Sequence, residues 1–342
     1  MRAFEWASPT TVEEAVQMLT SASSAPPATS PTTAPADSDE MPRPMAGGQD
    51  LLSTMKTYIM RPPRVVNLKT ITGLDGIADD GKGGLKIGAL VTISTLEENA
   101  DVKSRYPGLA EAAHSIATPQ IRNLGTVGGN LCQRPRCWYF RLENYKCLKK
   151  GGTKCFAFTG ENKYNAILGA GPSYFVHPSD LAPMLVALGA TVSIFGPDGS
   201  RTIPLETFFT LPTVQVRKEN VLKEGEIVTE VQVPPSQGST STYLKFKERS
   251  SLDFAMASVA VSAQLAADKT VQSVRLVLGG VAPIPWRVPE AEAFLVGKKL
   301  DAATTNQAAE LALKDAKAMD DNGYKIRLSK TLVRRALAKF NA

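Results

Sequence analysis

The stretch TPQIRNLGTVGGNLCQRPRCWYFR, residues 118–141, contains both features on which the fold assignment depends. It includes a glycine turn at 125–130, GTVGGN, where small residues could let backbone N–H groups meet an anion, as in phosphate-binding nests. It then enters the segment 132–155, which holds every cysteine of the chain. A candidate phosphate cradle therefore stands directly before a candidate metal-binding segment.

A second glycine turn lies upstream, at Ala46-Gly47-Gly48. Neither turn has the spacing G-x-G-x-x-G of a dinucleotide fold or G-x4-G-K-[ST] of a phosphate loop. A doubly wound nicotinamide domain and a nucleoside triphosphatase are therefore not supported. Each turn alone could also be only a turn.

The four cysteines have the spacing C-x4-C-x9-C-x7-C and are Cys132, Cys137, Cys147 and Cys155. Two disulfides are disfavoured, because a large chain without an export signal is expected in a reducing compartment. Structural zinc usually has paired C-x2-4-C knuckles, and only the first interval is of that size. The wider loops favour an iron-sulfur cluster, although zinc stays open at this point.

The cysteine segment also carries the whole charge excess of the chain. Seven Lys and Arg lie between residues 132 and 155 against the single acid Glu143, and the net charge of the full chain is +6. Four thiolates around a [4Fe-4S] core leave a negative charge, which nearby cations offset. The alternative is a basic loop in which Trp138, Tyr139 and Phe140 stack on nucleic-acid bases, and no fold suited to it is recognisable.

The composition, with 342 residues and 43% apolar, is that of an ordinary globular protein of two domains. We expect no secretory signal at the N-terminus, which lacks a continuous apolar segment, and no membrane span, because the longest apolar run, 181–196, is short and interrupted. The segment 21–40 is rich in Pro, Ser, Thr and Ala and predicts a flexible insertion. The segment 234–239 has the composition of a linker.

Hydrophobic periodicity and turn residues predict a mixture of helices and strands. Thr11 and Glu14 form a capping box for a first helix, and Ser94 is expected to cap a helix over 94–99. A strand from Ala166 is expected to lead through a turn at 177–180 into a helix from Leu181. Behind the linker we expect three strands and then helices over 289–296, 302–319 and 329–340. His114 and His177 are expected to be structural, because nothing pairs them with a nucleophile.

Four segments, AGGQDLL, TPQIRNLGTVGGNL, HPSDLAPMLVALGA and LKFKERSSLDFAMASVAVSA, occur in this order. Together they resemble the FAD-binding subunits of the xanthine dehydrogenase and carbon monoxide dehydrogenase family of molybdenum hydroxylases. The cysteine-bearing stretch LCQRPRCWYFR resembles, within that family, the flavin subunits of bacterial periplasmic aldehyde oxidoreductases, which hold an additional [4Fe-4S] cluster. The resemblance implies that all four cysteines are ligands of such a cluster.

The resemblance implies an α+β fold: a two-subdomain FAD-binding domain of the PCMH, or vanillyl-alcohol-oxidase-like, type over 1–233, then a smaller α+β domain over 240–342. It also implies which residues bind FAD, with the two glycine turns meeting at the diphosphate. These residues are Arg43, Pro44, Met45, Ala46, Gly47, Gly48, Gln49, Asp50, Leu51, Thr118, Gly125, Thr126, Gly128, Gly129, Asn130, Asp180, Ile227 and Lys245. Two alternatives remain: Asp180 could only cap the helix from Leu181, and Lys245 could be a solvated strand lysine.

The implied role is electron transfer. A partner with a molybdenum cofactor oxidises an aldehyde or heterocycle, [2Fe-2S] clusters carry single electrons, and the flavin here passes them to an external acceptor. We therefore expect no catalytic acid, base or nucleophile, partners assembled as a heterotrimer or its dimer, and no contact with nucleic acid or membrane. The compartment is expected to be the cytoplasm, or the periplasm by co-export with a partner. The rival hypotheses are a zinc-stabilised binding module and a stand-alone FAD oxidase.

Overall fold

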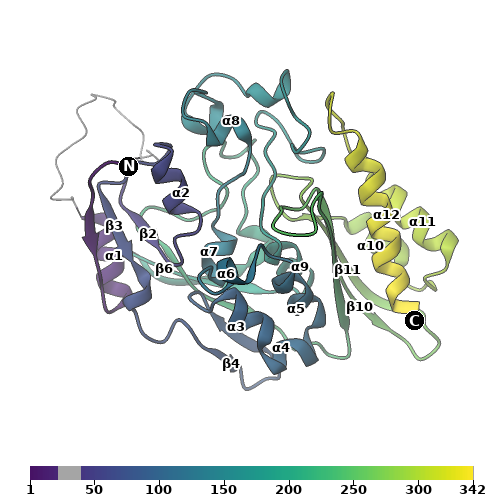
Figure 1. Ribbon diagram of the computed structural model, residues 1–342. Helices are drawn as coiled ribbons and strands as arrows, with labels where there is room; N and C mark the ends of the chain where they lie inside the picture. The colour runs from purple at the N-terminus through teal and green to yellow at the C-terminus, as the bar shows by residue number, and fades with distance from the viewer. Residues whose placement is uncertain (22–39, 342) are drawn as a thin grey trace.

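A computed structural model describes residues 1–21 and 40–341, which form three sheets with helices packed around them (Figure 1). The predicted flexible insertion at 21–40 lies, but for its two end residues, outside the described part of the chain. The N-terminal sheet and the C-terminal sheet stand at opposite sides of Figure 1, and the helices of the middle of the chain lie between them.

The first sheet is small and parallel, with the strand order β1-β3-β2. Its elements are β1 (Glu5–Ala7), α1 (Val12–Thr20), β2 (Arg43–Met45), α2 (Leu51–Lys56) and β3 (Arg64–Asn67). The Thr11 side chain accepts a hydrogen bond from the N–H of Glu14, so the predicted start of α1 is confirmed. The first glycine turn joins β2 to α2.

The second sheet has five antiparallel strands in the order β4-β5-β8-β6-β7. These are β4 (Ile77–Asp79), β5 (Leu85–Gly88), β6 (Thr191–Gly196), β7 (Gly199–Pro204) and β8 (Ile227–Val233). One hydrophobic core joins the sheet to α3 (Ile93–Glu98), α4 (Ala100–Arg105), α5 (Pro107–His114), α7 (Val127–Leu131) and α9 (Leu181–Ala187). The short α6 (Pro119–Arg122) precedes α7. The second glycine turn thus lies at the start of α7, over this core.

The third sheet is antiparallel, in the order β12-β11-β10-β9, and has a core of its own. Its strands are β9 (Thr240–Phe246), β10 (Ala257–Leu265), β11 (Val271–Gly279) and β12 (Trp286–Arg287), and its helices are α10 (Pro289–Leu295), α11 (Ala302–Ala312) and α12 (Tyr324–Ala338). Strand β8 ends at Val233 and β9 begins at Thr240. The domain boundary at 234–239 stays a prediction.

Residues 162–168, which precede the predicted domain boundary, are attached to the third sheet and its core. Ile167 and Leu168 belong to its hydrophobic cluster, and the carbonyl of Ile167 accepts the N–H of Lys317 at 2.8 Å. The side chain of Asn162 accepts the N–H of Asp321 at 2.9 Å. The chain leaving the cysteine segment is therefore fastened to the C-terminal sheet before it enters α9.

Three details differ from the expectation. Thr92, not Ser94, caps α3, because its side chain accepts the N–H of Thr95. Residues 166–176 form no strand, since Ile167 and Leu168 bond the carbonyl of Val281 outside any sheet ladder. Helix α11 ends at Ala312 and α12 already begins at Tyr324, because the residues between them make local turns.

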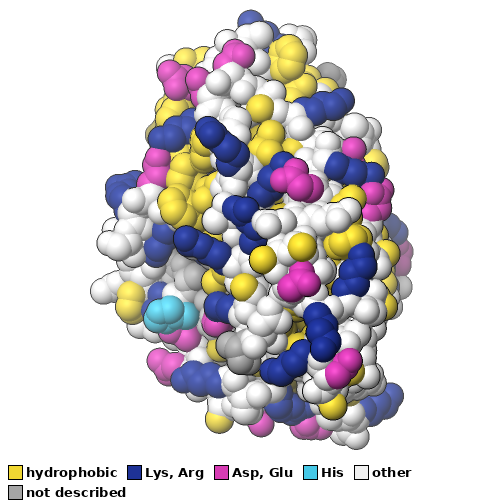
Figure 2. All heavy atoms as spheres, turned by 90° about the vertical axis from the view of Figure 1, so that its right-hand side faces the viewer, with side chains coloured by type: hydrophobic (Ala, Val, Ile, Leu, Met, Phe, Trp, Pro, Cys, Tyr) yellow, Lys and Arg dark blue, Asp and Glu magenta, His cyan; other side chains and the backbone are white. Residues whose placement is uncertain are grey.

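The cysteine segment contains the short α-helix α8 (Trp138–Arg141) and a 3-10 turn at Leu148–Lys150, and it lies above α7 in Figure 1. On the face presented by the C-terminal helices, Lys and Arg side chains are interspersed with acidic ones (Figure 2). Within the described residues, every helix is too short or too polar to span a bilayer.

Candidate functional site

A cavity of about 740 Å³ opens between the three sheets. Its walls come from the first glycine turn, the start of α7, the segment 217–226, the end of β9 and the loop that follows β9. A volume of this size is within the usual range of about 300–1,000 Å³ for sites that bind small molecules or cofactors.

The two glycine turns touch each other at one wall of this cavity. A Cβ atom placed on Gly47 would lie 1.9 Å from the carbonyl oxygen of Leu124, so only glycine allows this approach. Gly48 has a φ of +70°, in the left-handed region that favours glycine. Thr126 caps α7 by accepting the N–H of Gly129 at 3.1 Å. The turns therefore form one backbone-lined wall, as a cradle for an anionic group requires.

Asp180 lies at the cavity wall in a buried polar cluster. Its carboxylate accepts hydrogen bonds from the Tyr243 hydroxyl at 2.7 Å and from the Lys245 Nζ at 2.8 Å. The side chains of Asp180 and Lys245 are only 6% and 4% exposed. Burial raises the pKa of Tyr243 well above its ordinary value, and the neighbouring Asp180 carboxylate adds to this. The phenol therefore stays protonated and donates.

The geometry excludes the two alternatives, in which Asp180 only caps α9 and Lys245 is a solvated strand lysine. Asp180 precedes α9 but makes no side-chain capping hydrogen bond. Lys245 is buried and also donates to the Ser115 carbonyl at 3.1 Å. Both side chains are held in place at the cavity instead of facing solvent.

Most residues expected to bind FAD line this one cavity. They are Arg43, Pro44, Met45, Ala46, Gly47, Gly48, Gln49, Asp50, Leu51, Gly125, Thr126, Gly129, Asn130, Asp180 and Lys245. Thr118, Gly128 and Ile227 do not line it. Gly128 packs against Ala89, and Ile227 is buried in the core under the first sheet.

Two walls of the cavity were missed by sequence reasoning. The segment 217–226 is a charged run with a single glycine, Gly225, in a turn, and no pattern in it predicts a binding role. The loop 249–254, by contrast, belongs to the stretch LKFKERSSLDFAMASVAVSA, which carries the family resemblance and also contains Lys245. The signal for this second wall was therefore present.

The four cysteines lie in two kinds of surroundings. Cys137 and Cys147 pack in one hydrophobic cluster with Phe156, and Cys155 is close enough to Cys137 to influence its pKa. Cys132 lines the large cavity, where burial and the nearby Glu219 carboxylate raise its pKa to about 12. Three thiols are thus near one another, and the fourth lies on the side of the cavity.

The described side chains around the cysteines do not form a grouped metal site. Tetrahedral zinc with bonds of about 2.3 Å draws its thiolates to within about 4 Å of each other. Within residues 1–21 and 40–341, no three Cys, His, Asp or Glu side chains are grouped closely enough to hold a metal ion. This finding supports neither zinc nor a [4Fe-4S] cluster, and the role of the four cysteines as metal ligands stays a prediction. N–H groups of Tyr139 and Phe140 and the Asn165 amide donate toward Cys137, which suits a thiolate ligand.

Four of the basic residues in the cysteine segment form ion pairs with carboxylates. Arg134 and Lys149 pair with Glu219, and Arg136 and Arg141 pair with Asp50. Burial favours a raised pKa for Glu219, but the two cations hold it below its ordinary value. Four of the seven cations therefore share two carboxylates, which offset two of their four positive charges, so the segment contributes less to offsetting a cluster's charge than the sequence suggested.

Comparison with known proteins covers nearly the whole chain. Residues 2–236 match the FAD binding domain in molybdopterin dehydrogenase, and residues 241–340 match the CO dehydrogenase flavoprotein C-terminal domain. The chain belongs to this flavoprotein family. The family resemblance and the α+β fold expected from it are thereby confirmed.

Relatives of this flavoprotein are subunits of oxidoreductases. The aldehyde oxidoreductase FAD-binding subunit PaoB of Escherichia coli is 37% identical over 254 residues, 73% of this chain and 78% of that protein. The carbon monoxide dehydrogenase medium chain of Hydrogenophaga pseudoflava is 29% identical over 299 residues, 86% of this chain and 87% of that protein. Reconstituted CO dehydrogenase from Oligotropha carboxidovorans has a chain with a TM-score of 0.74 and 26% identity, over 98% of this chain and 97% of that chain. The present chain is accordingly the FAD-binding medium subunit of a molybdenum-hydroxylase-type oxidoreductase.

The cavity of this flavoprotein fits FAD. The backbone wall formed by Gly47 and the start of α7 suits a diphosphate, and Arg43 and Lys218 line the same cavity. Asp180 offers remaining carboxylate lone pairs to hydroxyl groups of a sugar-like chain. The contact that each residue makes with the cofactor stays a prediction.

Proposed function

We propose that this flavoprotein is the electron-transfer subunit of a molybdenum-dependent aldehyde oxidoreductase, receiving electrons from [2Fe-2S] clusters of a partner and delivering them to an external acceptor. The single observation that carries this is the cavity whose glycine turns and Asp180 lie within the matched FAD domain. The 37% identity to an aldehyde oxidoreductase subunit supports the substrate class of the complex. FAD, when bound, would supply the exchange between single electrons and electron pairs.

The protein's own residues would bind and orient this cofactor. The N–H groups of the two glycine turns would hold the diphosphate, and Lys245 would fix Asp180 toward the ribityl chain. Under this proposal the residues lining the cavity serve the cofactor, and the substrate chemistry belongs to the partner.

We further propose that Cys132, Cys137, Cys147 and Cys155 hold a [4Fe-4S] cluster. Cys137, Cys147 and Cys155 are near one another, and the N–H donors around Cys137 support it. Cys132 would have to join them from the cavity wall. Its thiol would therefore stand between the cluster and the flavin site.

The test is anaerobic purification followed by an absorption spectrum and analysis of flavin, iron, sulfide and zinc in one sample. One FAD with about four iron and four sulfide per chain supports both proposals. FAD with zinc, or without metal, overturns the cluster and leaves the flavin subunit. Absence of FAD after reconstitution overturns the proposed function. Reduction of the flavin by an aldehyde in the assembled complex, and not in the isolated chain, separates it from a stand-alone FAD oxidase.

A further inference from the structure

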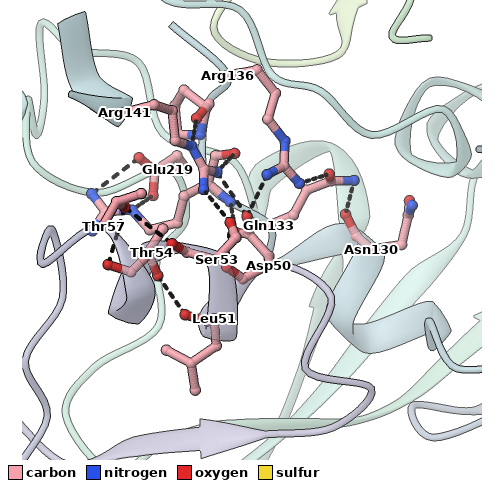
Figure 3. A network of polar contacts seen from close by, with 12 residues as sticks. Asp50, Leu51, Ser53, Thr54, Thr57, Asn130, Gln133, Arg136, Arg141 and Glu219 are labelled. Atoms are coloured by element: carbon pink, nitrogen blue, oxygen red, sulfur yellow. Dashed lines mark hydrogen bonds and ion pairs between the residues drawn. The ribbon is translucent and has the colours of Figure 1, made fainter. Parts of the chain in front are cut away.

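Asp50 ends the first glycine turn, yet its carboxylate is directed toward the cysteine segment (Figure 3). One oxygen accepts Arg136 Nη1 at 2.6 Å and Arg141 Nη2 at 2.7 Å, and the other accepts the backbone N–H of Arg134 at 2.7 Å. An aspartate at this place before a helix usually caps it, but Asp50 makes no capping bond to α2. The carboxylate serves the cysteine segment instead of its own helix.

Arg141 is the residue that folds the segment around this carboxylate. Besides Asp50, it donates to the Pro135 carbonyl at 2.7 Å and to the Arg134 carbonyl at 2.8 Å. Its side chain is 17% exposed and is not part of the cavity lining. Arg141 also donates to the Ser53 hydroxyl of α2 at 3.4 Å, so it acts on the cavity through Asp50, α2 and the backbone at 134–135.

A second carboxylate holds the same segment from another wall of the cavity. Glu219, 6% exposed, receives Arg134 Nε at 3.0 Å and Lys149 Nζ at 2.6 Å. Arg134 lies two residues after Cys132, and Lys149 two residues after Cys147. Because Asp50 and Glu219 both line the cavity, the segment is attached to two of its walls.

We propose that Asp50 and Glu219 couple the FAD cavity to the cysteine segment, so that FAD binding orders the segment and the ordered segment strengthens FAD binding. Asp50 is on this view a positioning residue whose partners are Arg136 and Arg141. The inference rests on the proposed function, because it takes the large cavity as the FAD site.

The physical reason is that the cysteine segment and the first glycine turn cannot move independently of each other. Displacing the segment leaves the half-buried Asp50 and the buried Glu219 without their cations, which is costly for carboxylates in low-dielectric surroundings. Displacing Asp50 moves the glycine turn that lines the cavity. Such coupling is reciprocal, and typical coupling changes an affinity by roughly 5- to 150-fold.

The experiment compares Arg141→Gln with Arg105→Gln in the full-length chain, purified anaerobically. Arg105 is a matched control, because it also bonds one carboxylate, Asp79, and two backbone carbonyls, and it does not line the cavity. The measurements are the FAD dissociation constant, from titration of apoprotein, and deuterium uptake of peptides over 134–150 with and without FAD.

We expect FAD to slow exchange over 134–150 in the wild-type chain. Arg141→Gln should raise the FAD dissociation constant by roughly tenfold and remove this protection. Arg105→Gln should leave both within twofold of wild type. Arg141→Lys keeps the charge near Asp50 but lacks the planar guanidinium, so its FAD dissociation constant and its exchange protection should lie between those of the wild type and of Arg141→Gln. Such an intermediate result shows that the effect of Arg141→Gln is not a loss of folding.

The inference is overturned when Arg141→Gln binds FAD within twofold of wild type, or when FAD leaves the exchange over 134–150 unchanged. A failure of the proposed function has a different signature, namely a wild-type chain that binds no FAD. The exchange measurement needs no iron, so the coupling is decided whether or not the cluster is present.

Discussion

Replacing Gly47 by alanine is expected to weaken FAD binding without unfolding the chain. The added Cβ would lie 1.9 Å from the carbonyl oxygen of Leu124, whereas ordinary contacts begin at 3.4 Å. One of the two glycine turns must therefore retreat by about 1.5 Å, the difference between these distances. The added Cβ is attached directly to the backbone and the Leu124 oxygen belongs to it, so no side-chain rotation can relieve the clash.

Overpacking of this kind costs about 1–3 kcal/mol. Because the displaced backbone is the wall assigned to the diphosphate, we expect this cost in the binding equilibrium, as a dissociation constant raised roughly 5- to 150-fold. The assay is titration of apoprotein with FAD, followed by flavin fluorescence, together with the melting temperature of the apoprotein.

Gly76→Ala is the matched control. A Cβ at Gly76 meets nothing within 4 Å, and this glycine does not have a positive φ. It should bind FAD like the wild-type chain. A Gly47→Ala protein that binds FAD as tightly as Gly76→Ala would refute the reasoning, since the turns would then not form the cofactor wall.

Three further changes test other parts of the structure. Lys245→Met leaves the buried Asp180 carboxylate without its cation and should destabilise the chain by about 3 kcal/mol in urea unfolding; adding Asp180→Asn should recover part of this, and no recovery would mean that the pair does not interact. Burial lowers the pKa of Lys325 to about 7. Above that pH the folded chain binds fewer protons than the unfolded chain, so the free energy of unfolding should rise with pH from about 7 toward 10. The expected slope is up to about 1.4 kcal/mol per pH unit. In Lys325→Met this contribution to the pH dependence of urea unfolding should disappear, and an unchanged slope would assign it to other groups. Cys147→Ser should lower the iron content of the anaerobically purified chain and leave FAD bound, whereas wild-type iron would exclude Cys147 as a ligand.

The fold was predictable where a local pattern decides it. The Thr11 cap of the first helix and the helix from Leu181 depend on neighbouring residues, and both are present. The segment 166–176 could not be predicted, because Ile167 and Leu168 are apolar for a different reason: they fill the core of a sheet that begins more than 70 residues later.

The residues of the site divide in the same way, into those predictable from local sequence and those that depend on distant contacts. The glycine turns are visible in the sequence because close backbone approach requires glycine. The roles of Asp50 and Glu219 were not visible, because a carboxylate before a helix or in a charged run has many possible partners. Asp50 was expected as an FAD ligand, and its bonds to Arg136 and Arg141 appear only once residues over 80 positions apart are brought together.

The attachment of residues 162–168 to the third sheet limits how this protein can be divided or recombined. A fragment ending at residue 236 would expose Ile167 and Leu168 and would leave Asn162 without Asp321. A chimera that takes only residues 241–340 from a relative would meet the same mismatch. The exchangeable unit is therefore discontinuous in sequence, and a working hybrid of two such flavoproteins has to transfer the stretch around 162–168 together with the C-terminal portion.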